Sequence, residues 1–353
     1  KPGVIRGRKA KGSDARPTAG WPGCRKKMQK KFRNFFRDRI VLRILTIGLF
    51  CFLLLNYFLL TSLHATGTTA AEFLNLGIGA RPTAMGQAFG AVSDDLNAVF
   101  SNPAGLSKLN QSQITLHHNE GLVGTRYEFL GFAYPNKLGS LAVSIFYLTS
   151  GEMIGRTVNG HKSSNFTASD TAYTISYGNN LIGGSLGQFA FGINLKFIQQ
   201  EIATVKAKAI AADFGVLYQP IESLKFGICL SNTGSSIKFI KEETALPTKL
   251  LLSTAFQPLS SGLLISADLN LPIKDKSYLN FGLEYTIAKI FSARFGLNSQ
   301  NGYKTQKQSN FDTFSLSYGF GLKISNYSFD YAFIPFGDLG EMQRITLNIK
   351  FGK

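Results

Sequence analysis

The chain has 353 residues and a formal net charge of +17. Residues 1–67 hold 15 basic and 2 acidic side chains, so residues 68–353 keep a net charge of only +4, which removes the charge argument for a nucleic-acid-binding protein. The hydrophobic content of 44% excludes a disordered chain, and a mean hydropathy near zero excludes a helical multi-span transporter.

The first 67 residues have the layout of an export signal. A basic stretch at 25–43 is followed by an almost wholly apolar run at 44–60 and then by the small residues Ala65 and Gly67. This order is typical of a secretory signal peptide cleaved after one of those small residues. An apolar run of about 17 residues is also at the lower limit for an uncleaved membrane anchor.

We assign residues 28–67 to the signal peptide, because Met28 is the first methionine of the chain. Residues 1–27 are basic, rich in Gly and Pro, and show no hydrophobic period. We interpret them as a non-native or disordered segment upstream of the translation start. Cys24 and Cys51 also lie in this leader, so Cys229 is alone in the body, which excludes a disulfide framework or a cysteine-built zinc site there.

Residues 68–110 differ in composition from the rest of the body and are predicted to form a hatch, a segment that plugs the lumen of a barrel. They are rich in Gly and Ala, and small residues let a backbone pack closely against a wall. A short helix is predicted from about Asp94 to Phe100 with Ser93 as its N-cap, and the Asn-Pro-Ala-Gly sequence at 102–105 ends it.

Residues 111–353 alternate between apolar and small or polar side chains. Phe189, Phe191 and Ile193, for example, are separated by Ala190 and Gly192. Period two predicts β-strands. We expect fourteen strands, near 113–119, 127–134, 139–147, 171–177, 189–198, 209–218, 224–232, 248–258, 263–270, 280–287, 291–298, 313–324, 326–334 and 344–351.

The polar face of these strands favours a membrane barrel over a soluble β-sandwich. A sandwich would expose many charges, whereas this face is mostly Gly and Ser, with a few charged candidates for the lumen: Glu284, Arg294, Lys323 and Asp330. The predicted fold is therefore all-β, a transmembrane antiparallel β-barrel of about 14 strands with an N-terminal hatch. The even strand count, with long connections after odd strands and short ones after even strands except at 178–188, places both termini in the periplasm and the barrel in the outer membrane.

The chain resembles the PorV/PorQ family of outer-membrane proteins, which is similar to the wider FadL group of hydrophobic-compound transporters. The resemblance rests on the last hairpin at 331–340 and on a hatch motif made of Gly77, Gly79, Ala80, Arg81, Met85, Gly86, Asp94, Asp95, Asn102, Pro103 and Gly105. It implies a fourteen-stranded barrel with an N-terminal hatch. The alternating residues of the last strand resemble the signal read by the barrel-assembly machinery: Ile345, Leu347, Ile349 and Phe351.

Motifs for chemistry are scarce. The histidines of the body, His117, His118 and His161, lack the spacing of a metal site or of a nucleophile turn. We expect no catalytic residue, no metal and no cofactor. Asp94 and Asp95 fit either helix N-terminal acids or a cation site. Arg81 is either a solvated surface residue or a latch that pairs with one of them or with lumenal Glu284 or Asp330.

The predicted function is non-enzymatic: a plugged FadL-like channel for hydrophobic small molecules. The alternative is a type IX secretion accessory that carries exported proteins to the cell surface, and an open porin is a weaker third possibility because the lumen is plugged. The expected partners are outer-membrane lipid, the barrel-assembly machinery, and a hydrophobic ligand or an exported protein cargo. No nucleic acid is expected.

Overall fold

The structure is a computed structural model that describes residue 3 and residues 69–121, 124–184, 187–258, 262–300, 314–335 and 340–352. The contacts divide the chain into two units, Lys1–Thr61 and Ser62–Lys353, and every helix and strand named here belongs to the second. The predicted signal peptide and the segment before it lie outside the described residues, apart from residue 3. No helix in the described part of the chain is long and apolar enough to cross a membrane.

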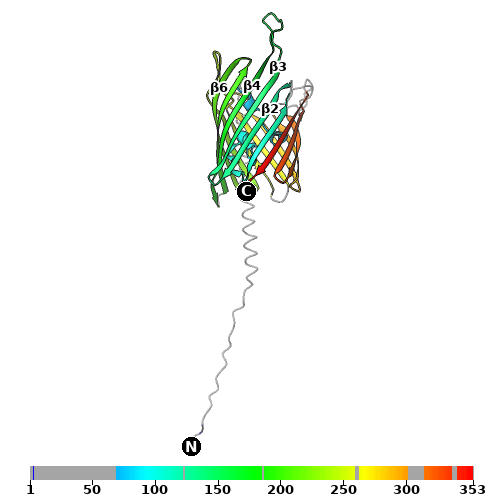
Figure 1. Ribbon diagram of the computed structural model, residues 1–353. Coiled ribbons are helices and arrows are strands. Elements are labelled where there is room, and N and C mark those ends of the chain that lie inside the picture. The colour runs from blue at the N-terminus through cyan, green and yellow to red at the C-terminus, as the bar shows by residue number, and fades with distance from the viewer. Residues whose placement is uncertain are drawn as a thin grey trace. The chain divides into compact units, whose positions relative to one another are not determined.

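Fourteen antiparallel strands close into one barrel, which confirms the predicted fold (Figure 1). The barrel closes because β1 pairs with both β2 and β16, with Ser112 opposite Phe351. The strands are β1 (Ser112–Glu120), β2 (Arg126–Asn136), β3 (Gly139–Met153), β4 (Phe166–Gly184), β5 (Gly187–Ile202), β6 (Val205–Ile221), β7 (Leu224–Gly234), β10 (Lys249–Phe256), β11 (Leu263–Pro272), β12 (Tyr278–Ile287), β13 (Phe291–Asn298), β14 (Ser315–Ile324), β15 (Tyr327–Pro335) and β16 (Glu341–Phe351).

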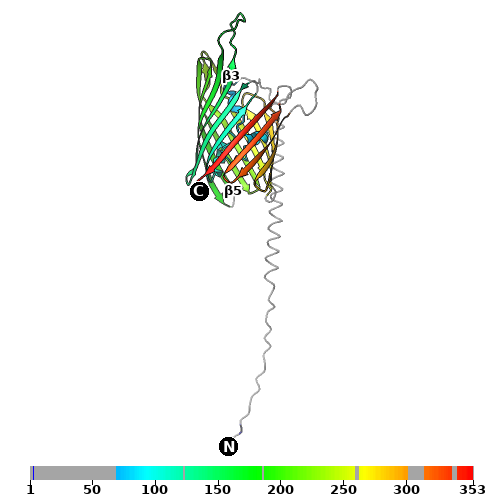
Figure 2. The same ribbon diagram turned by 45° about the vertical axis from the view of Figure 1, so that its right-hand side comes forward.

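The connections distinguish the two ends of the barrel. We call the end with the longer connections, such as 154–165 and 235–248, the loop end, and the end with short turns, such as 137–138 and 325–326, the turn end. The strands tilt across the wall between them, and the β3–β4 connection projects past the loop end (Figure 2). A two-stranded hairpin within the connection after β7, formed by β8 (Ile237–Phe239) and β9 (Glu242–Thr244), was not predicted.

Two predicted connections are instead continuous strand. The expected long loop after β5 is a paired extension that turns at residues 203–204, and the expected exception at 178–188 is a continuation of the β4–β5 ladder. Both segments carry polar side chains, and Lys206 pairs with Glu201 across β5 and β6 at 3.3 Å. Polar cross-strand pairs extend a ladder as well as apolar ones do, so a rule based on apolar alternation ended these strands too early.

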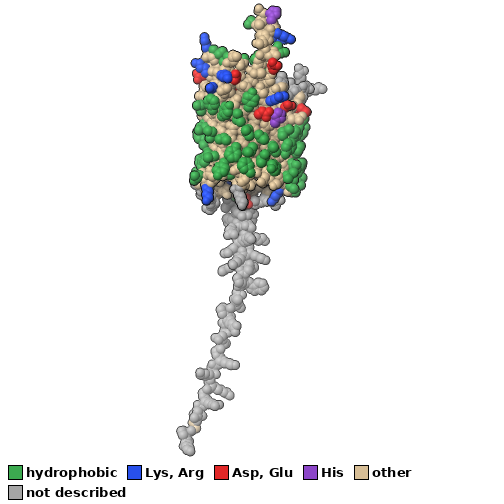
Figure 3. All heavy atoms as spheres, in the orientation of Figure 1, with side chains coloured by type: hydrophobic (Ala, Val, Ile, Leu, Met, Phe, Trp, Pro, Cys, Tyr) green, Lys and Arg blue, Asp and Glu red, His purple; other side chains and the backbone are tan. Residues whose placement is uncertain are grey.

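The period-two pattern divides each strand between two environments. Leu130, Val143, Ile175, Leu195 and Phe295 belong to a broad set of exposed large apolar residues on the outer surface. These residues form a continuous apolar band in the space-filling view, with most charges near the ends of the barrel (Figure 3). The alternate residues face the lumen and are small or polar, as in membrane barrels.

The four residues proposed as an assembly signal alternate on the outer face of β16, while Thr346 and Asn348 between them are buried on the inner face. Phe351 stacks on Phe132 of β2 with ring centroids 6.2 Å apart. The last strand therefore presents an apolar face to the outer surface of the barrel, next to β1.

The described residues locate only one of the two chain ends. The C-terminal strand ends at the turn end, but the first described residues of the barrel unit lie at the loop end, where Ala70 N donates to Ala245 O at 2.9 Å. The chain then crosses the lumen and reaches β1 at the turn end. The residues before 69 that would fix the true N-terminus lie outside the described residues.

The hatch contains four short helical turns inside the barrel: η1 (Glu72–Asn75), α2 (Ala80–Ala84), α3 (Ala98–Ser101) and η2 (Pro103–Lys108). Its apolar side chains bury against the wall; Met85 and Phe89 pack with Ala255 and Leu264, for example. The core of the molecule is thus the contact between hatch and barrel.

The predicted helix at 94–100 is wrong in its start and its cap. α3 begins at Ala98, and Asn97 occupies the N-cap position. The Ser93 hydroxyl instead donates to Phe89 O at 2.9 Å. Asp94 and Asp95, which lie before α3, both form ion pairs with Arg81. These tertiary contacts override the local helix propensity of the segment.

Gly86 marks the closest approach of hatch and wall. Its φ of +61° lies in the left-handed region, and a Cβ there would lie 2.6 Å from the backbone N of Leu297. Across this contact, a Cβ on Gly296 would lie 1.9 Å from Gly86 N. Only glycine fits on both sides.

We therefore expect Gly86→Ala to loosen the hatch next to this contact. A left-handed alanine costs about 1–2 kcal/mol, and the clash with the wall adds to it. Hydrogen–deuterium exchange at the Phe89 and Gly90 amides should accelerate at least about tenfold.

Gly160→Ala is the matched control, because Gly160 also has positive φ, +81°, but open space where the Cβ would lie. It should leave exchange in the hatch unchanged. Equal protection in wild type and Gly86→Ala would refute the close contact.

Candidate functional site

A buried arginine joins the hatch to the barrel wall. Arg81 lies in α2, directly after Gly79 and Ala80, and Ala80 N donates to Thr346 Oγ1 of β16 at 2.8 Å. Arg81 donates from Nε and Nη2 to the two carboxylate oxygens of Glu284, at 2.8 and 3.0 Å. The fork-shaped guanidinium fits a carboxylate in this bidentate way.

The same guanidinium holds two acids of the hatch itself. Arg81 Nη1 donates to Asp94, and to Asp95 Oδ2 at 3.1 Å. The Arg81 side chain is 15% exposed, and its guanidinium carbon lies 5.2 Å from the Phe89 ring centroid. We call these contacts of Arg81 with Glu284, Asp94 and Asp95 the latch.

The wall continues this network across neighbouring strands. Glu284 of β12 is directly opposite Arg294 of β13, and Arg294 Nε donates to Glu284 Oε2 at 2.6 Å. Arg294 Nη1 donates to Asp330 Oδ1 of β15 at 2.7 Å. Asp330, which the sequence offered as a partner for Arg81, is therefore paired with Arg294.

Burial and pairing set the charges of the hatch groups. Burial alone would lower the pKa of Arg81, but Asp94, Glu284 and Asp95 outweigh it and raise the pKa well above its ordinary value. Burial opposes the ionised form of Asp94, yet Arg81 and Lys225 hold the pKa of that carboxyl below its usual value. Burial raises the pKa of Asp95. The Arg81–Asp94 pair is thus the firmly charged part of the latch.

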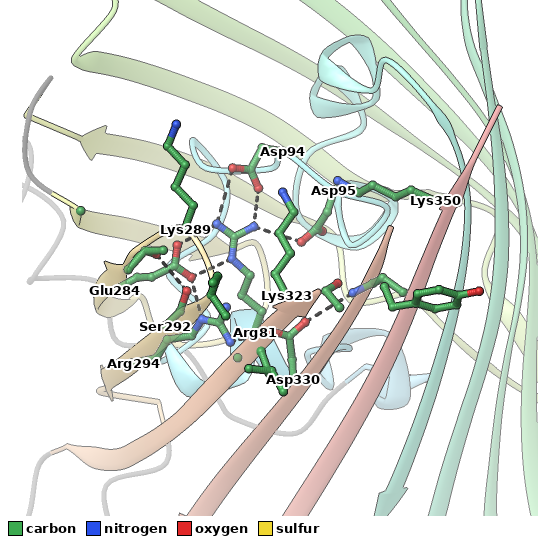
Figure 4. Close-up of a pocket in the computed structure, with 18 of the residues that line it drawn as sticks. Arg81, Asp94, Asp95, Glu284, Lys289, Ser292, Arg294, Lys323, Asp330 and Lys350 are labelled. Atoms are coloured by element: carbon green, nitrogen blue, oxygen red, sulfur yellow. Dashed lines mark hydrogen bonds and ion pairs between the residues drawn. The ribbon is translucent and has the colours of Figure 1, made fainter. Parts of the chain in front are cut away.

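The latch closes off a cavity at the turn end. This cavity has a volume of about 590 Å³ and is lined by Arg81, Asp94, Asp95 and the charged wall residues just described. Three lysines stand around it in the close-up view, namely Lys289, Lys323 and Lys350 (Figure 4). All four charged residues predicted to face the lumen line this one cavity: Glu284, Arg294, Lys323 and Asp330.

A second cavity lies on the loop-end side of the hatch. Its volume is about 280 Å³, and the hatch contributes Gly77, Thr83, Gly86 and Gln87 to its lining. Arg81 and Thr83 of one short helix therefore face different cavities. The hatch separates a loop-end cavity from a turn-end cavity.

The opposite side of the hatch is anchored by close packing. The Asn102 side chain donates to Val216 O at 3.1 Å and accepts from Ala104 N at 3.1 Å. The backbone at Pro103 lies where a Cβ on Gly192 would be, with Pro103 C at 2.2 Å. Gly105 likewise leaves room for Ser93, whose O would lie 2.1 Å from a Cβ.

A buried ion pair that sequence reasoning missed supports this anchor. Lys196 of β5 and Asp213 of β6 lie 2.7 Å apart, and both are almost fully buried. Asn194 donates to Val99 O of the hatch at 2.7 Å and to Asp213 Oδ2 at 2.6 Å. The sequence signal for this ion pair was the presence of Lys196 and Asp213 at inward-facing positions of two neighbouring strands.

The remaining candidates for chemistry are dispersed. His117 faces inward and is buried, and His118 faces outward, where it contacts Glu128 at 2.7 Å. Among the described residues, no group of three or more His, Cys, Asp or Glu side chains could hold a metal ion.

No family model and no curated protein matches the sequence. Solved structures do match the fold. The toluene transporter TodX of Pseudomonas putida matches with a TM-score of 0.56 and 12% identity over 78% of this chain and 99% of that one. The monoaromatic hydrocarbon channel CymD matches with a TM-score of 0.52 and 11% identity over 78% and 97%. A FadL homologue of Pseudomonas aeruginosa matches with a TM-score of 0.48 and 11% identity over 82% and 99%. The first two likenesses show that this chain shares the barrel fold of those two proteins, one a transporter and the other a channel.

We expect Arg81→Ala to open the lumen. The change removes the ion-pair partner of Asp94 and Asp95 and breaks the link from the hatch to Glu284, which keeps Arg294. Breaking a buried ion pair from one side costs about 3–5 kcal/mol. Single-channel conductance in planar bilayers should rise above that of the wild type.

Lys323→Ala serves as the control, because it removes the same charge from the lining of the same cavity and Lys323 makes no ion pair within the described part of the chain. Its conductance should match the wild type. An Arg81→Ala barrel that stays as closed as the wild type would rule out the latch.

Proposed function

We propose that this protein is an outer-membrane channel for hydrophobic small molecules, gated by its hatch. The observation that carries the proposal is the position of the hatch, which crosses the lumen between a loop-end and a turn-end cavity. A ligand entering one cavity reaches the other only if the hatch moves. The folds of the toluene transporter and of the hydrocarbon channel support a small, apolar cargo.

The two sides of the hatch suggest how it moves. Close packing against glycines of β4, β5 and β6 fixes η2. The end of α2 also packs closely, with Gly86 against Gly296 of β13, but α2 is the part of the hatch that charged groups hold to β12. Charged groups can exchange a protein partner for water, while a close-packed backbone gains nothing by leaving. We infer that α2 swings away from β12 while η2 stays in place.

We also propose that the barrel lies in the outer membrane. On this proposal, residues 28–67 export the chain, the barrel-assembly machinery reads β16, and the loop end faces the cell exterior. The hatch motif supports a PorV/PorQ-type barrel. In that family setting, the alternative cargo is an exported protein delivered through type IX secretion.

A reversible lock tests the motion of the hatch. Ala84 of α2 and Ala332 of β15 belong to one buried cluster, so Ala84→Cys with Ala332→Cys should place two thiols where a disulfide can join the hatch to the wall. Uptake of radiolabelled toluene by intact cells exporting the barrel should fall to the empty-vector level on oxidation and recover with a reductant.

The single variant Ala332→Cys, which retains the buried native Cys229, controls for oxidation itself. It should transport with or without oxidant. Full uptake through the oxidised double variant would exclude a route that needs α2 to move.

Native mass spectrometry of the detergent-extracted barrel distinguishes the cargo classes. A bound lipid or other small apolar molecule is the expected result for a channel. A bound C-terminal domain of an exported protein would favour secretion, and an empty barrel with high ohmic conductance would favour an open porin.

A further inference from the structure

The loop-end cavity has a polar wall built by strand register. Across β10 to β14, five inward-facing residues stand directly opposite one another at one level: Ser253, Asp268, Asn280, Asn298 and Ser315. The last four line the cavity, together with Asn270, the next inward-facing residue of β11. We call the set Asp268, Asn270, Asn280 and Asn298 the polar row.

Members of the polar row are buried but not satisfied. Asp268 Oδ2 accepts from Phe89 N and Gly90 N at 2.9 Å each, and Ser253 lies directly opposite Asp268 on β10. Asn270 Nδ2 and Asn280 Oδ1 have no hydrogen-bond partner among the described residues. These three side chains are 1–3% exposed.

Such groups call for a partner. Buried polar atoms in proteins are almost always hydrogen-bonded, because leaving one unpaired costs the full desolvation of that atom. A side-chain amide offers both a donor and an acceptor, so the row can bind a group that itself donates and accepts. A hydroxyl or a neutral amide has this property, and a hydrocarbon lacks it.

Apolar side chains make up another part of the lining. They are Leu74, Leu76 and Ile78 of the hatch and Leu251, Ile334 and Met342 of the barrel. Small-molecule sites combine such a surface with a few polar groups that fix orientation.

The charges of the cavity do not favour an ionic ligand. Two cationic residues line it, Lys249 and Arg344, and two acidic ones, Glu72 and Asp268. With equal numbers of each sign, the lining offers no excess charge to a carboxylate or an ammonium group.

We propose that the loop-end cavity is a binding site for neutral amphipathic small molecules, with an apolar body against the apolar side chains of the lining and a hydroxyl or amide group on the polar row. This inference rests on the proposed channel function and names its substrate class. The toluene and hydrocarbon cargoes of the similar folds carry no such group.

p-Cresol and toluene form a matched pair of probes, since they differ by one hydroxyl. Equilibrium dialysis of the full barrel in lipid nanodiscs, with empty nanodiscs subtracted, measures binding of each. We expect p-cresol to bind about tenfold more tightly than toluene, the gain from satisfying buried polar atoms. p-Toluate, with a carboxylate on the same ring, should bind more weakly than p-cresol.

Asn270→Leu and Asn280→Leu, made separately, should each reduce the preference for p-cresol to about twofold or less while toluene binding stays within about twofold of wild type. Toluene binding thereby reports that each variant remains folded. Thr286→Val, a near-isosteric loss of a hydroxyl at the turn-end cavity, should keep the full preference.

Equal binding of p-cresol and toluene to the wild type would overturn the inference and leave the channel proposal standing. Tighter binding of p-toluate would overturn the neutral class. Absence of binding by all three probes, with no uptake of toluene by intact cells, would instead contradict the channel proposal itself.

Discussion

A closed sheet of fourteen strands encloses more space than its own side chains can fill, and the remaining features of this molecule follow from that constraint. About eight strands give an interior just wide enough for side chains to fill. Here the chain fills part of the space with its own hatch, and the hatch must present groups that a polar wall can satisfy. The arginine in α2, with three carboxylates around it, is the main electrostatic contact between the two.

Hatch and wall meet through two kinds of contact with different energetics. On the side of β4, β5 and β6, glycines of the wall admit the hatch backbone so closely that any side chain would clash. On the side of β12 and β13, the close contact of Gly86 with Gly296 is joined by ion pairs that line a large polar cavity. Packing energy is lost at once when surfaces separate, whereas charged groups next to a wet cavity can be rehydrated. This asymmetry gives the hatch a fixed side and a releasable side.

The filled lumen is also uneven along its axis. The turn-end cavity is lined by many charged side chains, while the loop-end cavity combines apolar side chains with the polar row, three asparagines and Asp268. A molecule passing from loop end to turn end would exchange an amphipathic site for a polar one. The barrier between the two sites is one turn of helix, α2.

The sequence by itself determined the fourteen strands of the barrel and their inward and outward faces, because period-two alternation is a local property of the backbone. It ended β4, β5 and β6 at the last apolar alternation and missed their polar extensions. It identified Glu284, Arg294 and Asp330 as inward-facing and Arg81 as a hatch residue with acidic partners within reach. It misplaced the short helix after Ser93, because the two acids there pair with Arg81. Only the tertiary structure decided that Glu284 and not Asp330 meets Arg81, and that Asp268, Asn280 and Asn298 fall into one row. Those pairings depend on the register between strands and on a hatch residue 203 positions from its partner in the wall, and no local pattern encodes either one.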